Sequence, residues 1–263
     1  MVDSVEINGR KIKYLKFGNG SRVFVIIPGL SLKSVVDGAA AISYSYGIFS
    51  DEYTVYLFDR ADDPPAGYTL RQMAADTVRA MKKIGISKAC FFGASQGGMI
   101  LQIIAALYPD MTERIVLGST AAKENGTFNE VLGKWAEYAV RKDKENLVKS
   151  TLESVYSPET LIKYRKALYD YYKDLSDAEL ERYLVLASAC SNLDLTRYLK
   201  RIKCPVLVLG SYGDRVLTAA SSIEIMDTLK CEGYIYPNEY GHAVYDEADD
   251  YKSRIKEFFE RMK

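Results

Sequence analysis

No segment of the 263-residue sequence is an apolar run long enough to span a membrane, and the N-terminal stretch "MVDSVEINGRKIKY" lacks the apolar core of a signal peptide. An excess of one charge is also missing, because 35 Lys and Arg residues balance 35 Asp and Glu residues without a basic stripe or an acidic tail. We therefore expect a cytoplasmic protein that binds neither membranes nor nucleic acid.

Cysteine is scarce, and its spacing excludes two common structural uses. The four cysteines, Cys90, Cys190, Cys204 and Cys231, form no C-x-x-C pair. This pattern argues against a disulfide framework and against a zinc site. We expect reduced thiols that are mostly buried, and no metal.

The order of the predicted elements indicates an α/β fold. Alternating residues around Asn8-Gly9 predict an antiparallel hairpin, and β-branched or apolar runs predict buried strands at 22–27, 53–60, 88–92 and 114–119. A capping box of Thr69 and Gln72 starts a helix that continues to Gly85, and a second helix follows over 99–110. Part of 31–52 is expected to form a crossover helix. This alternation predicts a mostly parallel sheet with helices on both faces.

The pattern changes near residue 120, where four helical stretches follow one another without a strand. They cover 127–143, 145–156, 157–175 and 176–191, with starts marked by Ser157-Pro158 and by a capping box of Ser176 and Glu179. Strands at 204–211 and 233–237 and helices at 218–230 and 247–263 then complete the chain. We therefore predict a core at 1–119, a helical insertion at 120–200 and the remainder of the core at 201–263.

One serine stands in a glycine-rich turn between a predicted strand and a predicted helix. The stretch "GASQG" around Ser95 satisfies G-x-S-x-G, the pattern of a strained turn that exposes a nucleophilic serine. A P-loop requires Lys after its last glycine, but Met99 follows Gly98. The glycines at 93, 97 and 98 also miss the G-x-G-x-x-G spacing of a dinucleotide site. We therefore predict a nucleophile and no nucleotide cofactor.

The sequence contains a single histidine, His242, directly after the last predicted strand. A serine hydroxyl needs a base, and an imidazole needs a carboxylate to fix its tautomer. Asp214 follows the strand at 204–211 and lies between Ser95 and His242 in chain order, as in α/β-hydrolases. Asp194 and Asp246 are weaker candidates, the first at the end of the insertion and the second at the cap of the last helix. The predicted catalytic residues are Ser95, Asp214 and His242.

Four segments together resemble the α/β-hydrolase superfamily, in its branch with a helical cap. They read "PGL", "YTLRQMAADTVRAMKKIGISKACFFGASQGG", "CPVLVLGSYGD" and "YGHAVYDE". The resemblance implies an α/β-hydrolase fold with a mostly parallel sheet, an N-terminal antiparallel hairpin and an inserted helical cap over 120–200. It also implies an oxyanion hole formed by the backbone N–H groups of Leu30 and Gln96.

Two loops depart from the family pattern. Pro28 stands where the family often has a histidine before the glycine of the oxyanion loop. From the end of the strand at 53–60 into the following loop, the chain reads "FDRADDPP" in place of a D-x-R-G-x-G-x-S segment. Asp59 and Arg60 are therefore remnants of that pattern or unrelated to it, and neither departure touches the predicted triad.

Two of the inserted helices carry apolar and aromatic residues at helical spacing. These are Phe128, Val131, Leu132 and Trp135 on the first, and Tyr164, Leu168, Tyr171 and Tyr172 on the third. We expect them mainly to pack between the cap and the sheet, with some lining an apolar or aromatic acyl pocket.

The predicted activity is that of a serine hydrolase, carboxylesterase-like, that cleaves a small apolar or aromatic ester through an acyl-enzyme and needs no cofactor. The same triad would also serve a peptidase, a thioesterase or a C–C bond hydrolase. A small-molecule receptor with residual hydrolase activity is a further alternative. The sequence leaves the oligomeric state open.

Overall fold

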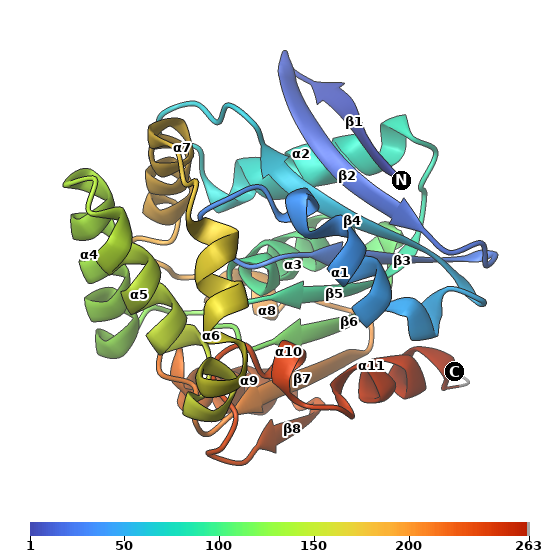
Figure 1. Cartoon of the computed structure of the whole chain (residues 1–263). Coiled ribbons are helices and arrows are strands. Elements are labelled where there is room, and N and C mark those ends of the chain that lie inside the picture. The colour runs from blue at the N-terminus through green and yellow to red at the C-terminus, as the bar shows by residue number, and fades with distance from the viewer. Residues whose placement is uncertain (262–263) are drawn as a thin grey trace.

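An eight-stranded sheet crosses the molecule, in the strand order β1-β2-β4-β3-β5-β6-β7-β8 (Figure 1). The computed structural model describes residues 1–261. The β1/β2 and β2/β4 pairs are antiparallel and the other pairs are parallel, which confirms the mostly parallel sheet with an antiparallel edge. The strands are β1 (Val2–Ile7), β2 (Arg10–Phe17), β3 (Arg22–Ile27), β4 (Tyr53–Ala61), β5 (Ala89–Ala94), β6 (Thr112–Gly118), β7 (Val206–Ser211) and β8 (Glu232–Tyr236).

The N-terminal hairpin turns at the two residues that the sequence indicates. Asn8 and Gly9 have φ angles of 53° and 74°, and Ile7 pairs with Arg10 across the turn. Two successive positive φ angles define a type I′ turn, whose twist matches that of the two strands. Asparagine and glycine tolerate this backbone, so the local sequence accounts for the hairpin.

Helices cover both faces of the sheet, and each face has its own hydrophobic core. Alternate residues of β3 point to opposite faces: Val25 and Ile27 pack with α2 and α3, whereas Phe24 and Ile26 pack with α11 and the segment before β4. The helices outside the 120–200 segment are η1 (Val35–Gly38), α1 (Ala39–Ser45), η2 (Gly47–Phe49), α2 (Leu70–Lys83), α3 (Gln96–Leu107), η3 (Pro109–Met111), α9 (Thr218–Leu229), α10 (Val244–Glu247) and α11 (Tyr251–Glu260).

The segment between β6 and β7 is helical, as expected. It contains α4 (Gly126–Val140), α5 (Lys144–Val155), α6 (Pro158–Tyr172), α7 (Asp177–Ser188) and the short α8 (Thr196–Leu199). Ser157 caps α6, and Ser176 with Glu179 forms the capping box of α7. Helices α4 to α7 lie beyond the carboxyl ends of the parallel strands (Figure 1). The division of the chain into core and cap domains stays a prediction.

The C-terminal helical region differs from the prediction. The last helix begins at Tyr251 rather than at residue 247, and a separate short helix, α10, precedes it. Ala248 between them has an extended backbone, with φ −88° and ψ 124°, and is buried in the core. Asp246 therefore lies within α10, and the residue at the start of the last helix is Asp250. The prediction that Asp246 caps the last helix was wrong.

Candidate active site

Ser95 is the single residue between β5 and α3, and its backbone is strained. Its φ of 52° and ψ of −121° lie in a region that residues with a side chain rarely adopt. Two neighbours hold this conformation: the Ser95 N–H donates to the carbonyl of Gly118 over 2.9 Å, and the Thr120 hydroxyl donates to the carbonyl of Ser95 over 2.7 Å. The surrounding structure therefore fixes the turn at the position that G-x-S-x-G predicts.

The glycines around Ser95 are required by close backbone contacts. A Cβ atom on Gly97 would overlap the carbonyl oxygen of Ile27. A Cβ atom on Gly93 would lie 2.6 Å from the carbonyl oxygen of Gly97, and one on Gly98 would lie 2.6 Å from the Thr120 side chain. Such distances are shorter than any carbon contact in a packed interior. The turn can therefore bring strand, helix and serine together only with glycine at these positions.

His242 and Asp214 form a buried pair. The distance from His242 Nδ1 to Asp214 Oδ2 is 2.9 Å, and both residues are buried. The other carboxylate oxygen, Oδ1, accepts the N–H groups of Val216 and Leu217 over 2.8 and 2.9 Å. Burial alone would raise the pKa of the Asp214 carboxyl, but the imidazole and the two N–H donors outweigh burial and hold this pKa below its ordinary value.

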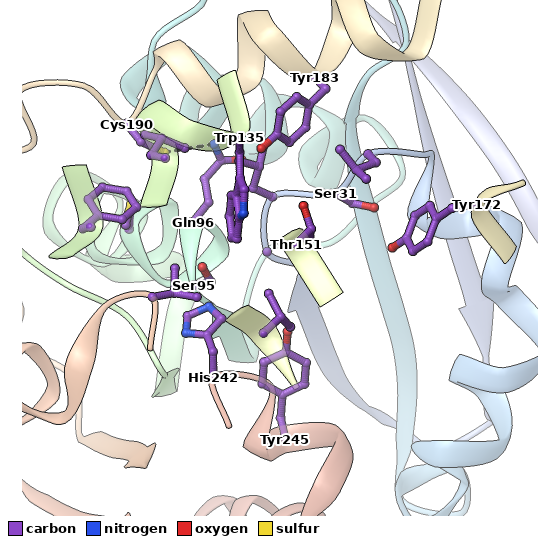
Figure 2. A pocket seen from close by; sticks show the side chains of 18 residues that line it. Ser31, Ser95, Gln96, Trp135, Thr151, Tyr172, Tyr183, Cys190, His242 and Tyr245 are labelled. Atoms are coloured by element: carbon purple, nitrogen blue, oxygen red, sulfur yellow. Dashed lines mark hydrogen bonds between the residues drawn. The ribbon is translucent and has the colours of Figure 1, made fainter. Parts of the chain in front are cut away.

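Ser95 and His242 line the same cavity of about 70 Å³, which we call the serine cavity. Figure 2 shows the Ser95 hydroxyl beside the His242 ring. The predicted triad residues are far apart in the sequence, since His242 is 28 residues from Asp214 and 147 residues from Ser95. The structure brings these three residues together. The weaker candidates lie elsewhere: Asp194 accepts hydrogen bonds from Thr196, and Asp246 lies 3.5 Å from the Tyr156 hydroxyl.

The two predicted oxyanion donors also line the serine cavity. Leu30 lies in the loop after β3, and Gln96 is the first residue of α3. Within residues 1–261, no protein acceptor takes a hydrogen bond from the backbone N–H of either residue. The loop passes close to the serine, because a Cβ atom on Gly29 would lie only 3.3 Å from Ser95 Cβ. The arrangement can therefore present two N–H groups beside the serine.

Two residues at the end of β4 hold this loop, and the sequence analysis did not assign them a role. Arg60 donates to the carbonyl of Pro28 over 2.5 Å, and Asp59 accepts the Ser34 hydroxyl over 2.6 Å. Burial lowers the pKa of Arg60 to about 10, although the adjacent carboxylate opposes this effect, so the guanidinium stays charged at neutral pH. The only sequence signal for this role was the "DR" pair at the end of the strand.

Arg182 on α7 connects the helical segment to the same strand end. Its guanidinium donates to Asp59 Oδ1 over 3.1 Å and to the carbonyls of Ala61 and Arg60 over 3.0 and 3.2 Å. The Asp59 and Arg182 side chains are 3% and 11% exposed, so this is a largely buried ion pair. It therefore fixes α7 relative to the loop that contains Leu30. Nothing in the local sequence around residue 182 indicated this contact.

The aromatic and apolar residues of the helical segment divide between the cavity and the surface. Phe128, Leu132, Trp135 and Tyr172 line the serine cavity, whereas Tyr164 is 49% exposed. A second cavity of about 220 Å³, the tyrosine cavity, adjoins the first along the loop 29–31. Its walls include Tyr46, Tyr156, Tyr172, Tyr245 and Asp246.

The family model described as "alpha/beta hydrolase fold" matches residues 23–249 of the chain. The chain belongs to the α/β-hydrolase fold family. This confirms the fold that the resemblance implied, and the family match covers most of the described sheet.

Individual relatives are distant in sequence but cover the whole fold. The 3-oxoadipate enol-lactonase 2 of Acinetobacter baylyi is 22% identical over 258 residues, which are 92% of this chain and 94% of the relative. The α/β-hydrolase MGS-M2 from a Medee basin deep-sea metagenome superposes with a TM-score of 0.88 at 22% identity, covering 99% and 98% of the two chains. The enol-lactonase of Burkholderia xenovorans gives 0.86 at 20% identity, covering 98% and 100%.

Among residues 1–261, no helix is both long and apolar enough to cross a membrane. The same residues contain no group of three or more His, Cys, Asp or Glu side chains placed to hold a metal ion. The cytoplasmic location stays a prediction.

Proposed function

We propose that this protein is a serine hydrolase that cleaves a small carboxylic ester or lactone through an acyl-enzyme. Ser95 is the nucleophile, His242 the general base and acid, and Asp214 the residue that orients the imidazole. One observation carries the proposal: the strained serine faces the same cavity as the only histidine of the sequence, and a buried aspartate contacts the Nδ1 atom of that histidine.

The contact between His242 and Asp214 determines which imidazole nitrogen can act as the base. A carboxylate only accepts hydrogen bonds, so His242 Nδ1 carries the proton that Asp214 Oδ2 accepts. The neutral ring then has its lone pair on Nε2, which can take the proton of the Ser95 hydroxyl. Asp214 also stabilises the imidazolium that forms when the proton moves.

The reaction follows in two steps. The Ser95 oxygen attacks the carbonyl carbon while His242 takes the hydroxyl proton, and the imidazolium then passes this proton to the leaving alkoxide. A water molecule attacks the acyl-enzyme after giving its proton to the imidazole, and the serine recovers a proton as the acid departs. The overall change is the addition of one water across the ester bond.

The backbone N–H groups of Leu30 and Gln96 are the proposed donors to the oxyanion that forms when Ser95 attacks the carbonyl carbon. Both line the serine cavity and are free of protein acceptors within the described residues 1–261. Removing one donor from an oxyanion hole costs about 2.7–4 kcal/mol of transition-state stabilisation. Arg60 and Asp59 act as positioning residues here, because they hold the loop that contains Leu30.

An ester or lactone is favoured over the other carbonyl substrates. An alkoxide leaves more easily than an amine, and the enol-lactonases that match nearly the whole chain are named for the cleavage of an internal ester. Helices α4, α5 and α7 contribute Trp135, Thr151 and Tyr183 to the serine cavity, which supports a role of the 120–200 segment as a cap that selects the substrate.

A fluorophosphonate probe tests the nucleophile directly. The parent protein should be labelled, and Ser95→Ala should not. Ser31→Ala is the matched control, since Ser31 lines the same cavity, and it should be labelled like the parent. An unlabelled parent, or equal labelling of Ser95→Ala, would contradict the assignment. Turnover of matched aryl esters, thioesters and anilides then separates an esterase from a thioesterase, a peptidase and a slow receptor.

A further inference from the structure

Four polar side-chain atoms around the serine cavity have no hydrogen-bond partner within residues 1–261. They are Gln96 Oε1, Trp135 Nε1, Thr151 Oγ1 and the Tyr183 hydroxyl. Gln96, Trp135 and Tyr183 are 1%, 5% and 2% exposed. Leaving a buried polar atom unsatisfied disfavours folding by about 1–3 kcal/mol, and native proteins contain few such atoms. Four of them around one cavity therefore require a group that enters the cavity, either water or an oxygen of the substrate, to complete their hydrogen bonds.

These four residues, which we call the polar ring, come from four different elements. Gln96 begins α3, Trp135 lies on α4, Thr151 on α5 and Tyr183 on α7. Figure 2 shows Trp135, Thr151 and Tyr183 directed into a common space next to Gln96 and above Ser95. Each of the four helices contributes one residue to the polar ring, so the tertiary packing of the helices brings these side chains together.

The orientation of Gln96 is fixed by its other side-chain atom. Its Nε2 donates to the carbonyl of Leu186 over 2.7 Å and to the Cys190 sulfur over 3.2 Å. A carbonyl accepts only, so the amide nitrogen must occupy this side and Oε1 faces the cavity as an acceptor. Trp135 Nε1 can only donate, whereas the Thr151 and Tyr183 hydroxyls can do either. The polar ring therefore offers both donors and an acceptor.

The ring is electrically neutral. No Lys, Arg, Asp or Glu lines the serine cavity in the described part of the chain. Burial raises the pKa of the Tyr183 hydroxyl well above its ordinary value and raises the pKa of the Cys190 thiol to about 11, so both stay protonated at neutral pH. A buried carboxylate or ammonium group on a substrate would find no opposite charge there, which disfavours charged groups. The polar ring is therefore suited to bind a neutral oxygen atom of a substrate.

The size of the cavity limits the group that enters it. Its volume of about 70 Å³ is less than half of the roughly 150 Å³ that an engineered apolar cavity needs for benzene. The adjoining tyrosine cavity, at about 220 Å³, is larger and more open. Because the leaving alcohol must depart before water enters, we place the leaving group on the side of the tyrosine cavity and the covalently retained acyl group in the serine cavity.

We propose that the polar ring selects a small acyl group that carries a hydroxyl, so that the substrate is a hydroxyacyl ester or lactone. The substrate hydroxyl would accept from Trp135 Nε1 and donate to Gln96 Oε1, with Thr151 and Tyr183 completing its surroundings. This inference rests on the proposed function and replaces the apolar or aromatic acyl group expected from the helix stripes. Gln96 then acts twice, through its backbone N–H and through its side-chain oxygen.

Two phenyl esters of the same shape test the selectivity. Phenyl 3-hydroxybutyrate and phenyl 3-methylbutyrate differ only by a hydroxyl in place of a methyl group. The parent should prefer the hydroxy ester by about tenfold or more in kcat/KM, because a site built to bind a hydroxyl leaves its own polar groups unpaired with the analogue. Equal kcat/KM for the two esters would overturn the proposal while leaving the serine hydrolase assignment intact.

Variants that remove one polar atom test the ring itself. Tyr183→Phe and Thr151→Val should each reduce the preference by about two- to tenfold, the effect of one neutral hydrogen bond. The loss should fall on the hydroxy ester, with the methyl ester unchanged or faster. Tyr138→Phe is the matched control, because Tyr138 lies on α4 but does not line the serine cavity, and it should keep the parent ratio. Variants that slow both esters equally would refute a role in selectivity.

The serine hydrolase function and the hydroxyl selectivity of the polar ring can be refuted separately. If neither ester is hydrolysed and the fluorophosphonate probe does not label Ser95, the proposed function is wrong. The ring can then still be tested by binding of 3-hydroxybutyramide and 3-methylbutyramide, followed by protein NMR. Stronger binding of the hydroxy amide, lost in Tyr183→Phe, supports the inference, and equal binding overturns it.

Discussion

Replacing Asp214 by Asn changes one atom of the candidate site and should remove most of the activity. The Oδ1 position accepts the N–H groups of Val216 and Leu217, so the carbonyl oxygen of the new amide must take that place. Its NH₂ group then faces His242 Nδ1 at a separation near the present 2.9 Å. An NH₂ group only donates, so Nδ1 must become the acceptor and the ring proton must move to Nε2. The imidazole could then no longer take the proton of Ser95.

The expected loss of activity depends on whether the asparagine amide of the variant can rotate. Rotating the amide would put NH₂ against two N–H groups and leave both without an acceptor, at about 1–3 kcal/mol each. The wrong tautomer is therefore the favoured arrangement. In serine proteases the same aspartate-to-asparagine change lowers kcat about 10⁴-fold, which corresponds to roughly 5 kcal/mol of activation free energy. We expect a loss of this order here.

Hydrolysis of an aryl ester at pH 7 measures the loss, with circular dichroism to show that the variant is folded. Asp194→Asn is the matched control, because Asp194 is a weaker candidate for the same role but lines neither the serine cavity nor the tyrosine cavity. The control should keep kcat within a few-fold of the parent. If Asp214→Asn retains activity within about tenfold of the parent, the tautomer argument is refuted.

Three further predictions concern stability. Arg182→Met removes the ion-pair partner of the buried Asp59 and should lower the free energy of unfolding in urea by about 3–5 kcal/mol; a parent-like value would contradict the role of this pair. Gly97→Ala should prevent folding by its overlap with a carbonyl of β3, whereas Gly133→Ala on α4, in open space, should add about 0.5–1 kcal/mol in thermal melts. Desolvation by the surrounding protein raises the pKa of the Asp246 carboxyl, although part of the residue is exposed to solvent. The protonated Asp246 carboxyl therefore contributes fully to stability below its unfolded pKa of about 3.9, and this contribution is lost as the pH rises through the higher folded pKa. Asp246→Asn should melt at a higher temperature than the parent at pH 7, but not at pH 3.

The features that the sequence predicted correctly depend on local chemistry. Asn8-Gly9 supplies two positive φ angles, and the capping boxes at Thr69 and Ser176 satisfy N–H groups three residues away. The elbow at Ser95 is equally local, since glycine spacing determines whether the turn can form. The catalytic roles of His242 and Asp214 stay predictions, and the sequence offered them because it has one histidine and because chain order then favoured Asp214.

The features that escaped prediction depend on contacts between distant segments. Arg182 meets Asp59 across more than a hundred residues, and nothing near either residue specifies its partner. The helix boundary near Asp246 was misplaced for a related reason: Ala248 leaves the helical conformation because the core buries it, although alanine itself favours helix. Tertiary packing decided both outcomes.

Helical periodicity predicted an apolar and aromatic lining for the serine cavity, but it could not indicate the polar atoms of the ring. Trp135 lies on an apolar stripe of α4, and periodicity treats its indole as hydrophobic. The ring nitrogen is nevertheless a hydrogen-bond donor, and in the serine cavity it has no acceptor among the described residues. Phenylalanine at Trp135 and Tyr183 and valine at Thr151 would occupy similar space without unsatisfied atoms. Packing alone would be served as well by these apolar residues, so the polar atoms around the serine cavity fit a site that binds an oxygen of the substrate, as proposed above.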